Sequence, residues 1–246
     1  MRTLRFEEKN ITLDESVIFG RGVFETILVN DKPVLFNEHI ERLNKGIEVL
    51  DIGEKVKTDM LLNNIYNLKI KNCALKIIVT PKNIIMIKRD LLYKKEDYIK
   101  GFKLKISDVS RNSTSPLTYI KSINYIDNIM ENKKCKKEGF NEVIFLNEKG
   151  YATEGSTSNI FMVKDKIIYT PEIKCGLLKG IVRDCIVKNN FCVEKEITIE
   201  ELLKSDEVFI TNSLIGIMKV TSINNTIFNN HSITNDIKEK YYKSIT

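Results

Sequence analysis

Residues 121–161 read KSINYIDNIMENKKCKKEGFNEVIFLNEKGYATEGSTSNIF, and the rest of the chain is organised around this stretch. Lys121 stands at its head and Glu154 near its end. Between them the sequence predicts a helix over residues 123–137, because lysines fill its last turns and Gly139 can end it, and then a strand at EVIFL. The apolar residues of this helix share one face, which is expected to pack and hold Lys121 in place: Ile126, Ile129 and Met130.

Further pieces accompany this stretch on both sides. Upstream are FGRGVFETILV and NEHIERL, and downstream are YTP, GLLKGIVRD and DEVFITNSLIGIMKV. Together with K-S-x-N-Y and G-Y-x-T-E-G-S-x-x-N-I-F, these seven pieces resemble, in the same order, the class IV aminotransferases, which are the fold-type-IV pyridoxal phosphate enzymes. The resemblance covers roughly residues 12–223. It implies an α+β fold of two domains, like that of D-amino-acid aminotransferase, and pyridoxal 5'-phosphate as cofactor.

The resemblance implies roles for three residues of the central stretch. Lys121 matches the lysine that forms a Schiff base with the cofactor aldehyde and later moves a proton, which an amine of lowered pKa can do. Glu154 matches the carboxylate that favours the protonated pyridine nitrogen, so that the ring is an electron sink. Tyr125 matches the tyrosine that hydrogen-bonds the phenolic oxygen. Without the resemblance, a lysine in a chain with 39 Lys and Arg residues is more often a solvated surface charge.

The cofactor phosphate has matching residues in three other pieces. Arg42 lies off the apolar stripe of its predicted helix, which alone indicates a solvated arginine, but the family's arginine at this position binds the phosphate. GLLKGIVRD predicts a helix that begins at Gly180, where the N–H groups of Ile181 and Val182 could bind a phosphate. The family has threonine at Val182, so the hydroxyl contact is lost here. Ser213 matches a phosphate-contacting hydroxyl.

Two polar residues have open interpretations. Asn159, in the family's N-[IL]-F position, is expected to support the polar network of the site, and an ordinary asparagine at a strand start is an equal alternative. Arg111 lies near the expected junction of the domains. In the family this interdomain region lines the pocket, so Arg111 could contact a substrate carboxylate. A plain linker arginine is equally compatible with the sequence.

Composition excludes several classes of protein. The 246 residues are 42% hydrophobic, enough for a substantial core. The net charge of +6 comes from lysines scattered among acidic residues, without a nucleic-acid-binding motif, and therefore indicates a solvated surface with a bias toward anionic ligands. No run approaches the ~18 apolar residues of a membrane span, and the N-terminus lacks the apolar core of a signal peptide. A cytoplasmic protein that binds neither membrane nor nucleic acid is expected.

The cysteines and histidines limit the chemistry further. Five cysteines without a C-x-x-C pair are typical of free thiols in a reducing compartment. Only His39 and His231 are present, which excludes a histidine-rich metal site and leaves few candidates for a Ser-His-Asp triad. No metal is expected, and acid-base work falls to Lys, Glu or Tyr.

The domain boundaries follow from local patterns. Residues 1–111 are expected to form a small N-terminal domain, with a helix capped by Asn37, another near 58–68, a hairpin around PKN and a last strand at KLKIS. Residues 112–122 read as the linker that reaches Lys121. Residues 123–246 form the larger domain, with further strands, the capping-box helix at T198-I-E-E201 and a final helix near 234–244. The N-terminal strand common in the family is degenerate or absent here.

Two stretches favour one activity among the three that share this scaffold. The family's lyases place a threonine at Thr26, where branched-chain aminotransferases tend to read F-E-G-I-R, and NSLIGIMKV resembles the lyases' N-S-L-M-x-x-M-P-V, with Lys219 in place of the proline. The expected function is therefore 4-amino-4-deoxychorismate lyase, which forms 4-aminobenzoate and pyruvate in folate biosynthesis. Thr26 could help to protonate the departing enolpyruvate.

Other functions stay open. A D-amino-acid or branched-chain amino acid aminotransferase would use the same lysine. A protein of another class, an inactive dimer that binds the cofactor or a metabolite, is a further alternative. The resemblance also implies a homodimer acting on a small-molecule substrate, because sites of the family lie between domains and include residues of the second subunit.

Overall fold

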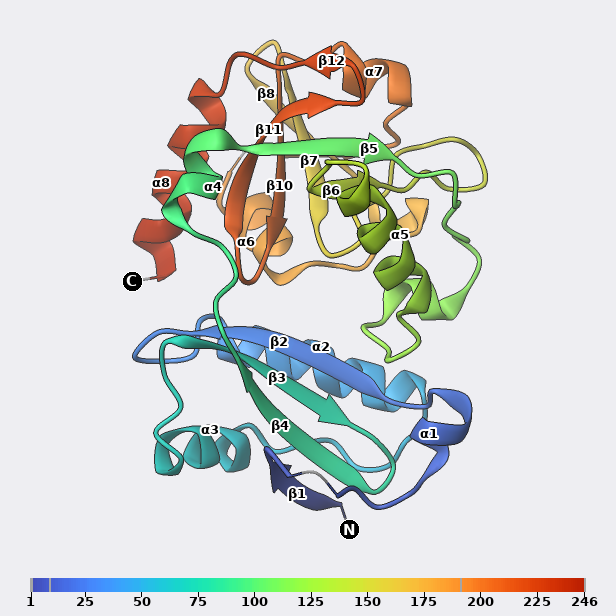
Figure 1. Cartoon of the computed structure of the whole chain (residues 1–246), viewed down its shortest axis with the longest axis vertical. Helices are drawn as coiled ribbons and strands as arrows, with labels where there is room; N and C mark the ends of the chain where they lie inside the picture. The colour runs from blue at the N-terminus through green and yellow to red at the C-terminus, as the bar shows by residue number, and fades with distance from the viewer. Residues whose placement is uncertain (1, 9, 191, 246) are drawn as a thin grey trace. The chain divides into compact units, whose positions relative to one another are not determined.

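The structure is a computed structural model that describes residues 2–8, 10–190 and 192–245. Its chain divides into two compact units (Figure 1). Unit 1 comprises residues Met1–Leu92 and Ile120–Tyr125, and unit 2 comprises Tyr93–Tyr119 and Ile126–Thr246. The chain therefore passes between the units three times, whereas the sequence predicted one linker over residues 112–122. Both units contain helices and sheets, as the predicted α+β class requires.

Unit 1 is a four-stranded sheet with helices packed on it. The strand order is β1-β4-β3-β2, with β1 parallel to β4 and the other neighbours antiparallel. The strands are β1 (Thr3–Phe6), β2 (Val23–Val29), β3 (Cys73–Val79) and β4 (Asn83–Arg89). The helices are α1 (Glu15–Phe19), α2 (Phe36–Val49) and α3 (Thr58–Asn67). The N-terminal strand is thus present, although its sequence did not predict it clearly.

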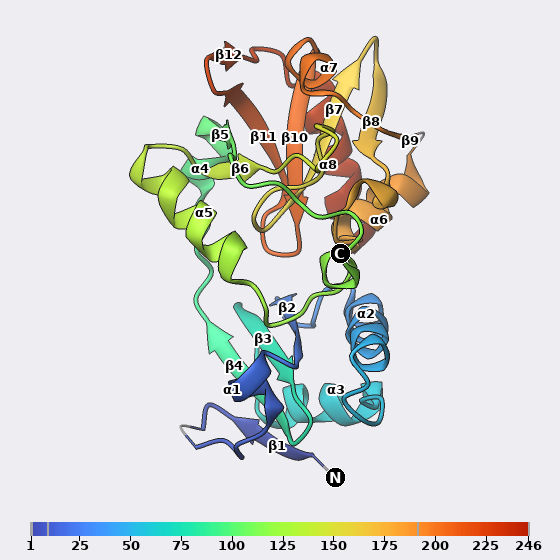
Figure 2. The same ribbon diagram turned by 90° about the vertical axis from the view of Figure 1, so that its right-hand side faces the viewer.

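The core of unit 1 follows the predicted periodicities. Ile40, Leu43 and Ile47 of α2 pack with Ile27 of β2 and Leu75 of β3 in one buried cluster. Figure 2 shows α2 and α3 on the same side of this sheet. Asn37 does not cap α2, so that prediction is wrong: the helix begins two residues earlier than predicted, at Phe36, and its N-cap is Leu35, whose backbone is left-handed and whose side chain makes no capping bond.

Unit 2 is built on a larger sheet in the order β6-β5-β11-β10-β7-β8-β9, with β12 paired to β11. Its strands are β5 (Phe102–Ile106), β6 (Glu142–Ile144), β7 (Asn159–Lys164), β8 (Ile167–Pro171), β9 (Cys192–Lys195), β10 (Glu207–Asn212), β11 (Gly216–Ile223) and β12 (Thr226–Ile227). Its α-helices are α4 (Lys95–Lys100), α5 (Ile126–Lys137), α6 (Ile181–Asn189), α7 (Ile199–Leu203) and α8 (Ser232–Ile245). Short 3-10 helices lie at Pro116–Tyr119 and Ile173–Cys175.

Two predictions for this unit are wrong. The strand at KLKIS does not complete the N-terminal domain, because β5 pairs in parallel with β11 and β6. The apolar face of α5 does not pack on the unit, since Ile126 and Met130 are 62% and 61% exposed. Instead α5 buries Asn128, Glu131 and Cys135. The buried side of this helix is largely polar, and its two polar residues make hydrogen bonds there.

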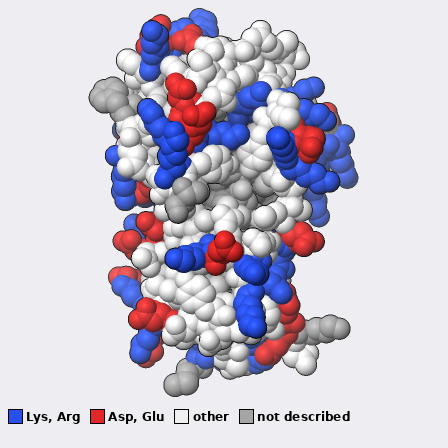
Figure 3. Space-filling model, turned by 90° about the vertical axis from the view of Figure 1, so that its left-hand side faces the viewer, with Lys and Arg blue, Asp and Glu red and all other residues white. Residues whose placement is uncertain are grey.

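Several local predictions are confirmed. The hairpin β3–β4, helix α3, the beginning of α6 after Gly180 and the capping box between Thr198 and Glu201 all lie where the sequence placed them. All five cysteines lie in the described part of the chain and are free thiols. Figure 3 shows basic and acidic side chains interspersed over the face that it draws. Among the described helices, each is too short or too polar to traverse a lipid bilayer.

Candidate functional site

Lys121 lies beside β2 in unit 1. Its carbonyl accepts a hydrogen bond of 2.9 Å from the N–H of Phe24, and the N–H of Ile123 donates to the carbonyl of Gly22 at 3.0 Å. The Nζ of Lys121 is 4.6 Å from the centre of the Phe24 ring and 5.4 Å from that of Tyr125. The two rings meet edge to face at 5.2 Å. The structure therefore brings together two predicted site residues, Lys121 and Tyr125, on an aromatic platform that the sequence did not reveal.

The backbone at Gly20, which precedes this platform in the chain, requires a glycine. Gly20 has a φ of +67°, and the side-chain amide of Asn124 donates to its carbonyl at 2.9 Å. A Cβ at Gly20 would lie 2.2 Å from the Oδ1 of Asn124. Because glycine has no Cβ and tolerates positive φ, it lets the Lys121 segment approach α1 closely.

Thr26 shares the face of β2 that carries Phe24. Side chains alternate along a strand, so Phe24 and Thr26 lie on one face and Glu25 on the other. Directly across from Thr26 on β3 is Lys76, whose Nζ is 4.3 Å from the centre of the Phe24 ring. Burial lowers the pKa of the Lys76 ammonium. This second lysine was missed, because nothing in the pattern LKIIVT distinguishes it from a solvated one.

Arg42 is not a solvated arginine. Its Nε and Nη2 donate to the two carboxylate oxygens of Glu25 at 2.7 and 2.8 Å, and its side chain is 14% exposed. The Nδ1 of His39 is 2.7 Å from Glu25 Oε2. Glu25 and His39 are almost fully buried. Sequence reasoning missed both of these residues.

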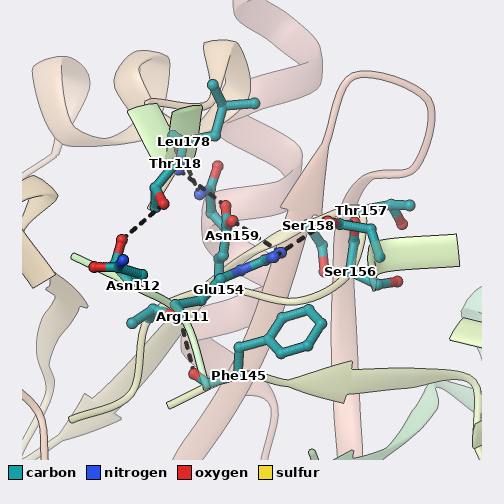
Figure 4. Close-up of polar contacts among 12 residues, drawn as sticks. Arg111, Asn112, Thr118, Phe145, Glu154, Ser156, Thr157, Ser158, Asn159 and Leu178 are labelled. Carbon is teal, nitrogen blue, oxygen red and sulfur yellow. Dashed lines mark hydrogen bonds and ion pairs between the residues drawn. The ribbon is translucent and has the colours of Figure 1, made fainter. Parts of the chain in front are cut away.

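Arg111 and Glu154 form a pair in unit 2 (Figure 4). Arg111 Nη2 lies 3.3 Å from Glu154 Oε1, and the guanidinium stacks 3.9 Å above the ring centre of Phe145. Its Nη1 donates to Asn128 of α5 at 3.2 Å. The N–H of Leu178 donates to Glu154 Oε2 at 3.0 Å. The carboxylate is thus buried and oriented from two sides, and a carboxylate has about four acceptor sites in all.

A corner of unit 2 joins the other predicted residues. Asn159 begins β7 and donates to the carbonyl of Leu178 at 2.8 Å. Its side chain lies so near Gly180, the N-cap of α6, that a Cβ there would be 1.8 Å from Asn159 Oδ1. Ile181 and Val182 form the first turn of α6, and both side chains are buried. Ser213 lies in the turn after β10, beside Thr211, which pairs with Asn159 across the sheet.

The residues of this corner fit a cofactor with a phosphate group and a ring nitrogen. The first N–H groups of a helix have no partner within it and favour an anion. The Oγ1 of Thr211 is buried and has no hydrogen-bond partner among the described residues. The buried carboxylate of Glu154 suits a protonated nitrogen. A helix start, an unsatisfied hydroxyl and an oriented carboxylate are the chemistry that pyridoxal phosphate needs.

One cluster could in principle hold a metal, which the sequence did not suggest. Ligand atoms of Glu172, Cys175 and Glu196 lie within 4.8 Å of one another. The ammonium of Lys174 is 2.9 Å from Glu172 and 3.9 Å from Glu196. Burial raises the pKa of the Cys175 thiol to about 11. A lysine already balances these carboxylates, and the thiol stays protonated at neutral pH.

Comparisons with known proteins agree with this fold. The pattern of the family described as "Amino-transferase class IV" matches residues 22–223. A "putative branched-chain-amino-acid aminotransferase" of Methanocaldococcus jannaschii is 28% identical over 96% of this chain and 91% of its own length. The aminodeoxychorismate lyase of Bacillus subtilis is also 28% identical, over 97% of this chain and 92% of its own.

A solved structure gives the same result. The crystal structure of a "putative 4-amino-4-deoxychorismate lyase" from Legionella pneumophila superposes with a TM-score of 0.88 at 26% identity, and covers 98% of each chain. The fold, the site and the family match together define a pyridoxal-phosphate-dependent enzyme. The chain belongs to the class IV aminotransferase family, whose members include both aminotransferases and lyases.

Proposed function

We propose that this enzyme is a 4-amino-4-deoxychorismate lyase, which forms 4-aminobenzoate and pyruvate for folate synthesis in the cytoplasm. The observation that carries the proposal is the position of Thr26, on the same face of β2 as Phe24, whose ring lies 4.6 Å from Lys121 Nζ. The lyases of the family have a threonine at this position. The similarity to the Bacillus subtilis lyase supports the proposal.

The residues of the chain then have distinct tasks. The cofactor, when bound, supplies an electron sink. The amine of Lys121 takes the proton from the amine-bearing carbon of the substrate. The bond between the ring and the enolpyruvyl oxygen breaks, the ring becomes aromatic, and enolpyruvate takes up a proton to give pyruvate. Thr26 orients or supplies that proton.

The residues that match the family's cofactor contacts are proposed to bind the cofactor. Arg42, Ser213 and the N–H groups of Ile181 and Val182 would contact the phosphate, Tyr125 the phenolic oxygen, and Glu154 the ring nitrogen, with Asn159 as support. Since the side chain of Val182 is a buried hydrocarbon, only its backbone contributes. From the sequence, Arg111 was either a contact for a substrate carboxylate or a plain linker arginine. Its contacts with Glu154 and Phe145 favour a role in orienting Glu154 instead.

The test is an assay of the purified, cofactor-loaded protein on enzymatically generated aminodeoxychorismate, which follows 4-aminobenzoate and pyruvate. D-Alanine and leucine, each with 2-oxoglutarate, are run alongside. Stoichiometric 4-aminobenzoate and pyruvate without amino-group exchange is the expected result. A Thr26→Val variant should lose the lyase rate while still binding the cofactor. Exchange without 4-aminobenzoate would reject the lyase and leave Lys121 and Glu154 in the same roles.

A branched-chain or D-amino-acid aminotransferase is the second candidate function. The Methanocaldococcus jannaschii relative favours it, since its identity to this chain equals that of the lyase. The pair Phe24-Glu25 also matches the start of the branched-chain pattern F-E-G-I-R, which has glycine at the place of Thr26. Rapid exchange with leucine but not with D-alanine would select the branched-chain activity.

A further inference from the structure

Glu25, His39 and Arg42, which we call the Glu25 cluster, lie where β2 faces α2. Glu25 is 0% and His39 is 1% exposed. Burial alone would raise the pKa of the Glu25 carboxyl, but Arg42 and His39 outweigh it and hold this pKa well below its usual range. Burial lowers the pKa of His39. At neutral pH the cluster therefore contains a carboxylate, a guanidinium and a neutral imidazole whose Nδ1–H donates to Glu25.

This geometry fixes the plane of the Arg42 guanidinium. A guanidinium carries five N–H groups in a rigid fork. Glu25 accepts from one edge, through Nε and Nη2, at 2.7 and 2.8 Å. Two parallel N–H groups of a guanidinium also match two phosphate oxygens. The bidentate pair with Glu25 therefore fixes the direction in which the whole guanidinium points.

Packing alone gives little reason for a buried charge at this position. The contact of α2 with the sheet is already made by apolar residues, among them Ile27, Ile40 and Leu43. A buried ion pair is weak evidence for stability, since apolar residues of similar volume often stabilise as well. The cluster also lies within electrostatic range of Lys121, which contributes to lowering the pKa of His39. It therefore belongs to the neighbourhood of the catalytic lysine.

We propose that Glu25 and His39 are positioning residues, which orient the guanidinium of Arg42 so that it binds the cofactor phosphate. The proposal rests on the phosphate contact of Arg42 under the proposed function. His39 holds the carboxylate, the carboxylate holds the guanidinium, and the guanidinium binds the phosphate. Loss of either residue should weaken binding of the phosphate and spare the rest of the cofactor.

The experiment compares the affinity of the apo-protein for pyridoxal 5'-phosphate with that for pyridoxal, which lacks the phosphate. Both are titrated by the change in ligand absorbance. Glu25→Gln should weaken pyridoxal phosphate by about 10- to 100-fold, the usual effect of losing a hydrogen bond to a charged group, and leave pyridoxal within about twofold. Arg42→Gln should likewise weaken the binding of pyridoxal phosphate but not of pyridoxal. In the double variant, Glu25→Gln should add little to the effect of Arg42→Gln.

Controls separate positioning from general destabilisation. Asp14→Asn removes another buried carboxylate of unit 1, outside the Glu25 cluster, and should leave the ratio of the two affinities unchanged. His39→Asn, whose amide can replace the Nδ1–H donor, should keep the wild-type ratio of the affinity for pyridoxal phosphate to that for pyridoxal. His39→Leu should lower this ratio. The His39 pair gives the same test if Glu25→Gln does not fold.

The outcomes distinguish two failures. An equal loss of both ligands in Glu25→Gln and His39→Leu would overturn the proposal, because it would show a structural role only. An unchanged ratio in these variants, with a lowered ratio in Arg42→Gln, would overturn it as well. An unchanged ratio in Arg42→Gln itself would reject the phosphate contact of Arg42, which belongs to the proposed function.

Discussion

Lys121 shares the Phe24 ring with a second lysine, and this gives a sharp test of which amine reacts. The Nζ atoms of Lys76 and Lys121 lie 4.3 and 4.6 Å from the ring centre. Borohydride reduction of the loaded protein should attach one pyridoxyl group, and mass spectrometry should place it on Lys121. Lys121→Ala should lose the label and reduce activity by about 10³-fold or more, because it removes the proton-transferring amine.

Lys76→Ala is the matched control for this prediction. Lys76 contacts the same ring, and burial lowers the pKa of its ammonium, so it is the nearest competing amine on this platform. The variant should keep the label on Lys121. A label that moves to Lys76, or that persists in Lys121→Ala at another site, would contradict the assignment.

Asp14 gives a prediction on pH. It accepts hydrogen bonds from Thr80 Oγ1 at 2.6 Å and from the N–H groups of Ser16 and Lys82, each at 2.9 Å. Burial alone would raise its pKa, but these bonds lower the pKa of Asp14 to about 2. A carboxyl with a depressed pKa stabilises the folded state above its unfolded pKa of about 4, and this contribution is lost as the pH falls toward 2.

Asp14→Asn should therefore lower the free energy of unfolding by about 1–2 kcal/mol at pH 7. Below pH 4 the difference from the wild type should shrink, and near pH 2 it should vanish. Urea unfolding at a series of pH values measures this. A difference that stays constant from pH 7 to pH 2 would show that the charge of Asp14 does not contribute.

At the scale of elements, a buried carboxylate holds the loop that follows Glu154. Glu142 of β6 accepts from the N–H groups of Ser156 and Thr157 at 3.0 and 3.1 Å, and from the Ser158 hydroxyl at 3.2 Å. Glu207 of β10 holds the start of α8 in the same way, because it accepts from the N–H groups of Ile233 and Thr234. Glu142 and Glu207 are therefore comparable buried carboxylates of unit 2, and one can serve as the control for the other.

Glu142→Gln and Glu207→Gln should both lower the melting temperature by several degrees, because each leaves hydrogen-bond donors poorly satisfied. Only Glu142→Gln should affect the binding and the spectrum of the cofactor, because the loop that Glu142 holds follows Glu154 directly in the chain. We expect weaker binding of pyridoxal phosphate and a changed absorbance spectrum for that variant. Equal effects of both variants on the spectrum would mean that Glu142 acts through stability alone.

The local elements were predictable because their signals are local. The hairpin β3–β4 has alternating residues around a turn, and the capping box of α7 needs only Thr198 and Glu201. Lys121 and Glu154 were predicted from the order of the motifs. The contacts between site residues could not be predicted in this way. Glu25, for example, meets Arg42, seventeen positions away, only once β2 and α2 pack.

Pairing between distant segments was the main source of error. β5 pairs with β11, more than a hundred residues later in the chain, and no pattern within KLKIS indicates this. The apolar side of α5 was assigned to the core by periodicity. In the structure Asn128 and Glu131 take the buried side, because Asn128 accepts from Arg111 and Glu131 accepts from Ser107.

For the whole molecule, the apolar surface of α1 argues for a homodimer. Val17, Ile18 and Phe19 of α1 are consecutive and between 59% and 72% exposed, and Leu13, just before the helix, is 65% exposed. Single exposed apolar residues are ordinary, but a contiguous apolar surface is typical of an interface. We predict a mass of about 57 kDa by light scattering, twice the 28.4 kDa of one chain.

Phe19→Ser should shift this equilibrium toward the monomer, because a buried aromatic side chain often carries much of the binding energy of an interface. Ile227→Ser is the control, since Ile227 is 69% exposed but lies on β12, away from α1 in sequence. Activity should fall with dissociation if the second subunit contributes to the site, and should recover as protein concentration rises. A wild-type mass of 28 kDa, or a Phe19→Ser variant that stays dimeric at nanomolar concentration, would remove α1 from the interface.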